Sequence, residues 1–364
     1  MPTERGLAST MSAWTTRGDG ISKVSACQMQ VPEPGPGEVL VKISALSLNY
    51  RDLLVIGGTG AWKPNRSVVP VSDAVGIVVG IGASTDRFAV GDRVSAMFLP
   101  KWQSGQLMRE TYMAPIGGPV NRGMLAQYVT IHQDEAVGVP YSLSDAQAST
   151  LPVAALTAWH AVVRRGRIQR GETVLIHGTG GVALFALQFA LALGALPIVT
   201  SSSDDKIRKL HALGSLTTIN YRKTPDVGAE ALRLTSGEGV DHVIETIGGE
   251  NLNQSLKAVK IGGSIEFIGL IAGLAAQINT YDFVSKNVTI HGVETGSREM
   301  YEEMAAFIDE HSIRPPIDST YAASDIRQAL QSLAGGRHFG KIVITMPHSA
   351  DRFQTSPVAC EPLN

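Results

Sequence analysis

The strongest constraint in the sequence is a regular alternation of short apolar segments with helical periods between residues 145 and 295. Strands that alternate with helices are typical of a parallel sheet covered by helices on both faces. The six strands predict an α/β fold with a doubly wound, six-stranded Rossmann sheet, which binds dinucleotides. The expected strands are 173–177, 197–200, 216–219, 240–245, 263–268 and 288–293, and the expected helices are 182–193, 204–213, 226–235 and 250–258.

A glycine-rich turn lies between the first expected strand and the first expected helix. Gly178, Gly180 and Gly181 stand there, and Ala183 replaces the last glycine of a G-x-G-x-x-G pattern. Glycine lets backbone N–H groups approach a pyrophosphate, and a helix beginning near Val182 directs its positive end at the anion. A structural turn alone would look similar, but the strand–turn–helix context favours a dinucleotide site at these glycines and Val182.

The end of the second strand bears on which nucleotide binds. An NAD site normally carries an acidic residue there, bound to the ribose hydroxyls. This strand instead ends in Ser201, Ser202 and Ser203, whose small hydroxyls leave room for a 2′-phosphate. Lys206 is the candidate partner of that phosphate, although a solvated helix residue is the other reading of it. NADPH is therefore the expected cofactor. Other nearby cations are Arg208, Arg222 and Lys223.

Composition argues against several classes of protein. The formal net charge is -2 and the charges are scattered, which argues against a nucleic-acid or membrane partner. The sequence shows neither a signal pattern nor a run of about 18 apolar residues, so a cytoplasmic location is expected. Its two cysteines, Cys27 and Cys360, form no zinc-binding motif. They are expected to be reduced thiols, with a disulfide between them as the alternative.

The regions that flank the alternating part have a different pattern. Residues 11–140 are mainly β-rich and are often interrupted by glycine and proline. Two further helices are expected at 298–310 and 324–334, followed by a strand at 341–345. A chain of 364 residues is long enough for two domains.

Seven segments together carry a family resemblance. Their content, order and spacing resemble the medium-chain dehydrogenase/reductase superfamily, and most of all its zinc-free, quinone oxidoreductase-like and alcohol dehydrogenase-like branch. The resemblance implies a GroES-like β domain at 11–150 and 296–346, a Rossmann domain at 151–295, flexible extensions at 1–10 and 347–364, and a homodimer. The segments are PGPGEVLVKISALSLNYRDLLV (34–55), VGIVVGIG (75–82), FAVGDRV (88–94), LPVAALTAWHAV (151–162), GTGGVALFALQFA (178–190), FIGLI (267–271) and HFGKIVI (338–344).

The sequence departs from the zinc-containing members of that superfamily. By resemblance, such relatives carry a cysteine where this chain has Asn49, a His-Glu pair where it has Ser72-Asp73, and a third ligand near Val153. None of these positions holds cysteine or histidine here, and residues 97–123 lack the four cysteines of a structural zinc site. We therefore expect no metal.

A site without zinc has no Lewis acid to polarise an oxygen atom. The expected reaction is therefore hydride transfer from NADPH to an acceptor that is already electrophilic, a quinone or the C=C bond of an enone or enal. Two alternatives stay open. One is a metal-free carbonyl reductase or alcohol dehydrogenase in which a tyrosine replaces zinc. The other is an NADP(H)-binding sensor or structural protein with little turnover.

The resemblance also implies individual site residues. Asn49 and Thr157 would line the nicotinamide end of the cofactor, Tyr221 would lie by the adenosine phosphate, and Thr246 would lie along the cofactor. Tyr50 is the best candidate for the proton donor, with a cleft-wall tyrosine as the other reading. The nicotinamide amide would contact Ile268, Gly269 and Leu270, and the substrate pocket would include Tyr50, Trp62, Trp102, Tyr128 and Met124, the last four of which equally suit a core.

Overall fold

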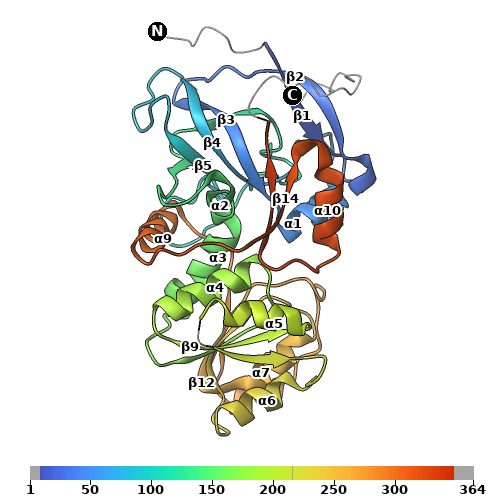
Figure 1. The fold of residues 1–364 in the computed structure, drawn as a ribbon, viewed down its shortest axis with the longest axis vertical. Helices are drawn as coiled ribbons and strands as arrows, with labels where there is room; N and C mark the ends of the chain where they lie inside the picture. The colour runs from blue at the N-terminus through green and yellow to red at the C-terminus, as the bar shows by residue number, and fades with distance from the viewer. Residues whose placement is uncertain (1–8, 215, 348–364) are drawn as a thin grey trace. The chain divides into compact units, whose positions relative to one another are not determined.

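The computed structural model describes residues 9–214 and 216–347, which form two compact units (Figure 1). Unit 1 contains residues 1–153 and 297–364, and unit 2 contains residues 154–296. The predicted extensions, 1–10 and 347–364, lie almost wholly outside the described residues.

Unit 2 is built on the predicted Rossmann sheet. Within the described residues it has six strands, all parallel to their neighbours, in the order β10-β9-β8-β11-β12-β13. This order confirms the doubly wound α/β fold, in which the chain reverses direction across the sheet next to β8. The strands are β8 (Thr173–Ile176), β9 (Leu196–Ser201), β10 (Thr217–Asn220), β11 (Val240–Glu245), β12 (Val259–Phe267) and β13 (Thr289–Gly292).

Helices cover both faces of this sheet, with α4 and α5 on one face and α6 and α7 on the other (Figure 1). The helix α4 is apolar on all sides because it packs against β8 and β9 below and against α3 above. The short α3 (Leu156–Trp159) lies between two π-helical segments, Leu151–Ala155 and His160–Arg165. The remaining helices are α4 (Gly181–Ala192), α5 (Asp204–His211), α6 (Val227–Leu234), α7 (Asn251–Ala258) and α8 (Thr280–Ser285).

Unit 1 is built on a largely antiparallel sheet in the order β14-β15-β3-β4-β5-β7, with β6 also paired to β3. The strand β15 pairs with β3, so the C-terminal segment returns to complete this unit as the resemblance implied. An apolar core that includes Val41, Leu46 and Ile344 packs against the sheet. Its strands are β3 (Glu38–Ser47), β4 (Asp73–Ile81), β5 (Arg93–Ala96), β6 (Tyr128–His132), β7 (Ala136–Gly138), β14 (Ile317–Ala322) and β15 (Lys341–Thr345).

Helices and a hairpin complete unit 1. The helix α1 interrupts the region expected to be mainly β, and it begins directly after Asn49, whose backbone N–H donates to Asp52 Oδ2 at 2.8 Å. This bond is one half of a capping box, which explains why a helix starts here. The elements are α1 (Tyr50–Ile56), α2 (Asp145–Ala148), α9 (Arg298–Glu310), α10 (Ile326–Ala334), and the paired strands β1 (Thr10–Thr15) and β2 (Ser25–Gln30).

The structure also bears on the state of the cysteines and on whether a helix could span a membrane. Cys27, on β2, is disulfide-bonded, so the expectation of reduced thiols is wrong for Cys27, and Cys360 lies outside the described residues. Over residues 9–214 and 216–347, every helix is too short or too polar to span a bilayer.

Candidate functional site

The glycine turn of unit 2 has the geometry of an anion cradle. Gly178 has a φ of +84°, in the left-handed region that favours glycine, and its N–H donates to Thr200 Oγ1 at 3.0 Å. Gly180 is the N-cap of α4 and no side chain caps the helix. A Cβ atom built on Gly180 would meet no protein atom within 4 Å. Free helical N–H groups that face open space suit a phosphate group.

A buried acid network behind the turn was missed by the sequence analysis. Glu245, at the end of β11, is fully buried, and its Oε1 accepts from the N–H groups of Ile247 and Gly248 at 2.8 and 3.0 Å. Its Oε2 accepts from Ser255 Oγ at 2.5 Å, and the same Oγ lies 3.0 Å from His177 Nε2. Burial lowers the pKa of His177, and the negative charge of Glu245 opposes this effect but does not overcome it. His177 therefore bonds locally, and Ser255 links it to the Glu245 carboxylate that holds the loop after β11.

The loops after β11 and β12 carry four of the residues expected along the cofactor. Thr246 Oγ1 donates to the His177 carbonyl at 2.5 Å, which ties the loop after β11 to the glycine turn. A Cβ atom on Gly269 would lie 2.0 Å from the Thr246 carbonyl, so only glycine allows this close approach. Ile268 and Gly269 both donate backbone N–H groups to the Glu245 carbonyl, and Leu270 follows at the surface. The structure therefore gathers Thr246 and residues 268–270 beside the cradle.

The candidate 2′-phosphate residues also lie near one another. Tyr221 N–H donates to the Ser201 carbonyl at 3.0 Å, so the ends of β9 and β10 are adjacent. Ser203 caps α5, and its Oγ accepts from the N–H of Lys206. Ser201 is buried, whereas Ser202 and Lys206 are half-buried.

The two acids that follow these serines are already paired. Lys223 Nζ lies 2.7 Å from Asp204, and Arg208 pairs with Asp205. Among the cations considered for the phosphate, Arg208 and Lys223 therefore each have a carboxylate partner.

Asn49 and Tyr50 lie in unit 1, at the start of α1. Asn49 is 8% exposed, and its Nδ2 donates to Asp73 Oδ2 at 2.8 Å. Lys341 Nζ donates to Asn49 Oδ1 at 2.5 Å and to the Leu48 carbonyl at 2.7 Å. Tyr50 is 40% exposed. Thr157 is buried on α3 and belongs to unit 2.

Sequence reasoning did not find Asp73 and Lys341 as a pair. Both are buried, and Lys341 Nζ lies 4.0 Å from Asp73 Oδ2. Burial raises the pKa of Asp73 to about 7, against Lys341 and Asn49, which lower it. Burial also lowers the pKa of Lys341, against the charges of Asp73 and Asp52. For each group, burial disfavours the charged form and the neighbouring opposite charge favours it.

A second ion pair lies beside this cluster. Arg51 Nη1 lies 3.4 Å from Asp52 Oδ1, and the Arg51 guanidinium stacks over the Phe98 ring at 4.7 Å. Asp52 also accepts the backbone N–H of Ser72, and burial raises its pKa against these partners. Val71, just before Ser72, has a φ of +73°, which is strained for a β-branched residue. Such strain persists where the surroundings over-determine the backbone, and it clusters at functional sites.

The expected pocket residues separate into two groups. Trp62 and Tyr128 are half-buried, with Trp62 at the end of a short 3-10 helix. Trp102 is 1% exposed and its Nε1 donates to the Gly105 carbonyl, and Met124 is 3% exposed in the core of unit 1. The burial of Trp102 and Met124 favours the core reading that the sequence left open for them.

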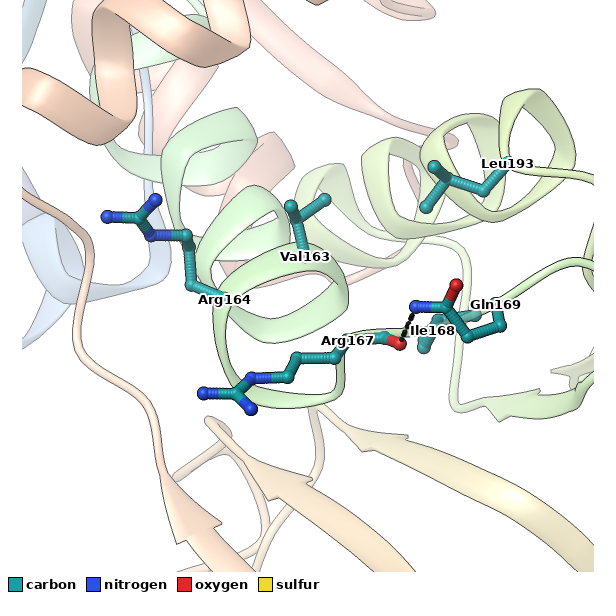
Figure 2. Close-up of a pocket in the computed structure, with 6 residues that line it drawn as sticks. All are labelled: Val163, Arg164, Arg167, Ile168, Gln169 and Leu193. Atoms are coloured by element: carbon teal, nitrogen blue, oxygen red, sulfur yellow. Dashed lines mark hydrogen bonds between the residues drawn. The ribbon is translucent and has the colours of Figure 1, made fainter.

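Unit 2 has a surface depression of about 500 Å³ (Figure 2). Figure 2 shows the Gln169 amide bonded to the Arg167 carbonyl at its edge. Because Leu193 is the C-cap of α4, the depression lies about 18 Å from the glycine cradle, at the other end of a 12-residue helix. It is therefore a separate feature from the cradle. Its lining is Val163, Arg164, Arg167, Ile168, Gln169 and Leu193.

The residues of unit 1 do not fit a zinc ion. Asn49 and Ser72 are poor zinc ligands, and Lys341 places an ammonium group against Asn49 and Asp73. Across the part of the chain that the structure describes, no three His, Cys, Asp or Glu side chains are grouped to hold a metal. The donor set is consistent with a zinc-independent enzyme.

Fold and cradle together define a class, the two-domain oxidoreductases with a GroES-like domain and a Rossmann domain. Residues 35–141 match the family described as "Alcohol dehydrogenase GroES-like domain", and residues 181–310 match "Zinc-binding dehydrogenase". A zinc-type alcohol dehydrogenase-like protein of Schizosaccharomyces pombe is 36% identical over 332 residues, which cover 89% of this chain and 96% of that protein. The chain belongs to the medium-chain dehydrogenase/reductase superfamily.

Two further relatives agree with this assignment. The solved structure of a candidate alcohol dehydrogenase from Sinorhizobium meliloti is 38% identical with a TM-score of 0.88, covering 93% of this chain and 100% of that one. The quinone oxidoreductase of Mus musculus is 27% identical over 327 residues, which cover 87% of this chain and 91% of that protein. Members of the superfamily are oxidoreductases that use a nicotinamide dinucleotide and act on small molecules.

Proposed function

We propose that this protein is an NADPH-dependent, zinc-independent oxidoreductase that reduces a quinone or the C=C bond of an α,β-unsaturated carbonyl compound. One observation carries the proposal. The positions at which zinc-containing relatives hold their metal carry Asn49, Ser72 and Asp73, and Asn49 and Asp73 are held by Lys341. A site of this kind has no Lewis acid, so it suits an acceptor that is electrophilic without one.

The cofactor assignment rests on unit 2. The glycine cradle, with Gly178, Gly180, Gly181 and Val182, would hold the pyrophosphate. Tyr221 and Ser201 would flank the adenosine end, where Ser202 and Lys206 would bind the 2′-phosphate that distinguishes NADPH from NADH. Thr157, Thr246, Ile268, Gly269 and Leu270 would line the rest of the cofactor. When bound, NADPH supplies the hydride.

The chain's own residues would supply position and a proton. Asn49 has one Nδ2 proton beyond the bond to Asp73, and through it Asn49 would donate a hydrogen bond to the cofactor amide or to the substrate oxygen. The hydroxyl of Tyr50, a residue that is 40% exposed, would donate a proton to the substrate as the hydride arrives. Trp62 and Tyr50 would form the wall against which a flat acceptor packs.

Turnover is tested by NADPH oxidation with a panel of acceptors. The panel contains a benzoquinone, a cyclic enone, an enal and a saturated aldehyde, and NADP with an alcohol tests the reverse reaction. We expect the quinone or the enone and enal to be reduced and the saturated aldehyde to be inert. Reduction of the aldehyde would instead support a metal-free carbonyl reductase, and tight NADPH binding without any turnover would support a sensor.

The cradle is tested separately with Gly180→Val. The Cβ atom of the new side chain would meet no protein atom within 4 Å, so the free energy of unfolding should fall by no more than about 1 kcal/mol, the cost of replacing glycine with valine at an N-cap. The Kd for NADPH should rise at least tenfold, because the side chain occupies the cofactor's place. Gly138→Val is the matched control, since Gly138 also faces open space but lies in unit 1.

We also propose a homodimer and a cytoplasmic location. The strand β13 is an edge strand of the sheet, and the neighbouring segment 270–284 exposes an unusual number of large apolar side chains. A second copy paired along β13 would cover them and would satisfy the free edge. The exposed side chains are Leu270, Ile271, Leu274, Ile278, Tyr281, Phe283 and Val284.

A further inference from the structure

Three distant segments of unit 1 meet in one buried polar cluster. Asn49 precedes α1, Asp73 begins β4 and Lys341 begins β15. We propose that Lys341 is a positioning residue that fixes the side-chain amide of Asn49, so that one Nδ2 proton of Asn49 points to the reacting molecule. This inference deepens the proposed function, because it rests on Asn49 contacting the cofactor or the substrate.

The orientation of the Asn49 amide follows from the donors and acceptors around it. An ammonium group only donates, so the atom that Lys341 Nζ faces at 2.5 Å must be the oxygen Oδ1. The other end of the amide, Nδ2, then donates to Asp73 Oδ2 at 2.8 Å. A rotated amide would place two donors together at Lys341 and two acceptors together at Asp73. The two neighbours therefore allow one orientation, and a single Nδ2 proton remains for another partner.

This orientation does not depend on the charge state of Asp73. The titratable and charged groups that face Asp73 are Lys341, Asp52, Arg51 and Tyr301. Its Oδ1 has no hydrogen-bond partner among the described residues, so a proton on Asp73 would sit there. Its Oδ2 would still accept from Asn49. The Tyr301 hydroxyl is also buried without a described partner.

The backbone places Lys341 with little freedom. The N–H of Leu48 donates to the Ile342 carbonyl at 3.0 Å, which extends the pairing of β3 and β15 up to the cluster. Gly340 has a φ of +86°, and a Cβ atom on it would lie 2.2 Å from the Pro316 carbonyl oxygen. The chain therefore turns into β15 at a position where only glycine fits, and Lys341 enters the interior directly after it. This placement explains how a lysine can be buried beside an asparagine.

The first test measures the Asn49 side chain itself. The protein is labelled with 15N-asparagine, and the Asn49 amide signals are assigned by their loss in Asn49→Asp. In the wild type we expect two well-separated Nδ2 proton signals that exchange slowly with water. In Lys341→Met we expect these signals to move together and exchange at least tenfold faster. Unchanged Asn49 signals in Lys341→Met would overturn the proposal.

Removal of Lys341 alone leaves the Asp73 carboxylate buried without a compensating charge, which destabilises a fold. The variant Lys341→Met, Asp73→Asn is therefore made as well, since it leaves no buried charge unpaired. The proposal predicts that Asn49 is also mobile in this neutral double variant. Lys257→Met is the control, because Lys257 forms an exposed pair with Asp226 in unit 2.

The second test is a double-mutant cycle on turnover with the acceptor that the panel identifies. Lys341→Met should lower kcat by about ten- to a hundredfold, the effect of one lost hydrogen bond to a charged group. The Kd for NADPH should change less than kcat. In an Asn49→Ala background the same substitution should cost less than about threefold, because Lys341 acts through Asn49.

The two tests separate the possible failures. If Lys341→Met costs the same factor with and without Asn49, Lys341 is only structural and the proposal is wrong. If no acceptor is turned over but Lys341→Met still releases the Asn49 amide, the proposed function fails while the anchoring of Asn49 holds.

Discussion

The clearest physical prediction concerns Glu266, a fully buried carboxylate on β12 of unit 2. Its Oε1 accepts from Ser264 Oγ at 2.6 Å and lies 3.4 Å from His291 Nδ1, while Oε2 has no partner among the described residues. Burial raises the pKa of Glu266 from its ordinary 4.5 to about 7, against the hydrogen bond from Ser264, which lowers it. Glu266→Gln should imitate the protonated form, because the amide keeps an acceptor for Ser264.

The sign and size of the effect follow from proton linkage. Between pH 4.5 and 7 the folded protein keeps the Glu266 proton while the unfolded chain has lost it. The stabilising contribution of Glu266 to the free energy of unfolding is therefore fully present below pH 4.5. It is lost as the pH rises towards 7, by about 1.4 kcal/mol per pH unit. Above pH 7, the contribution of Glu266 to the free energy of unfolding of the wild type should be about 3 kcal/mol smaller than it is below pH 4.5. Glu266→Gln cannot ionise, so its advantage should grow from near zero at pH 4.5 to about that value at pH 8.

Urea unfolding followed by tryptophan fluorescence at a series of pH values measures this difference. Trp159 reports on unit 2, where it packs edge-on against Phe189. Burial lowers the pKa of His291, and because His291 is present in both the wild type and Glu266→Gln, its own titration largely cancels from their difference in the free energy of unfolding. Glu238→Gln is the control, since Glu238 is exposed in the same unit. An advantage of Glu266→Gln that is constant with pH, or largest in acid, would refute the reasoning.

Three other predictions concern the proposed site and assembly. Lys206→Ala should narrow the difference between NADPH and NADH binding by about 1–3 kcal/mol in fluorescence titrations, and an unchanged preference would exclude Lys206 as the phosphate partner. Tyr50→Phe should lower kcat by about a hundredfold if Tyr50 donates the proton, with little change in the Kd for NADPH, whereas an unaltered rate would assign the proton to another group. Ile271→Asp should convert a dimer to a monomer in sedimentation experiments, and a wild type that is monomeric would remove the basis of that prediction.

The elements of unit 2 were predictable because local signals agree with one another. Parallel strands buried on both faces read as continuous apolar runs, and β11 occupies the predicted 240–245. The helices α5 and α9 begin at the predicted residues 204 and 298, each directly after a serine N-cap, Ser203 or Ser297. Unit 1 gave weaker signals. The strand β14, IDSTYA, is only partly buried and mainly polar, and the seven-residue α1 is too short for a helical period to stand out.

The two halves of the candidate site differ in the same way. The glycine cradle is a contiguous segment, so a strand, a turn and a helix in sequence were enough to indicate it. Lys341 and Asn49 are 292 positions apart, and their contact depends on the pairing of β15 with β3. The hydrophobic pattern of the sequence predicts that each strand exists, but it does not predict which strands are neighbours in the sheet. The same limit hid the hydrogen bonds that the Glu245 carbonyl accepts from Ile268 and Gly269, because they depend on the pairing of β11 with β12.

Zinc and Lys341 exclude each other at the Asn49 site. The Lys341 ammonium group lies 4.0 Å from Asp73 Oδ2. Two unit positive charges held about 4 Å apart repel each other by about 4 kcal/mol at an effective dielectric constant of about 20. A dication would meet about twice that repulsion and would find only one carboxylate ligand there. We therefore expect added Zn²⁺ to leave the free energy of unfolding unchanged, whereas a ligand at 100 times its Kd would add about 2.7 kcal/mol. Stoichiometric zinc retained after gel filtration, and lost in Asp73→Asn, would show that the metal displaces Lys341 and that the proposed chemistry is wrong.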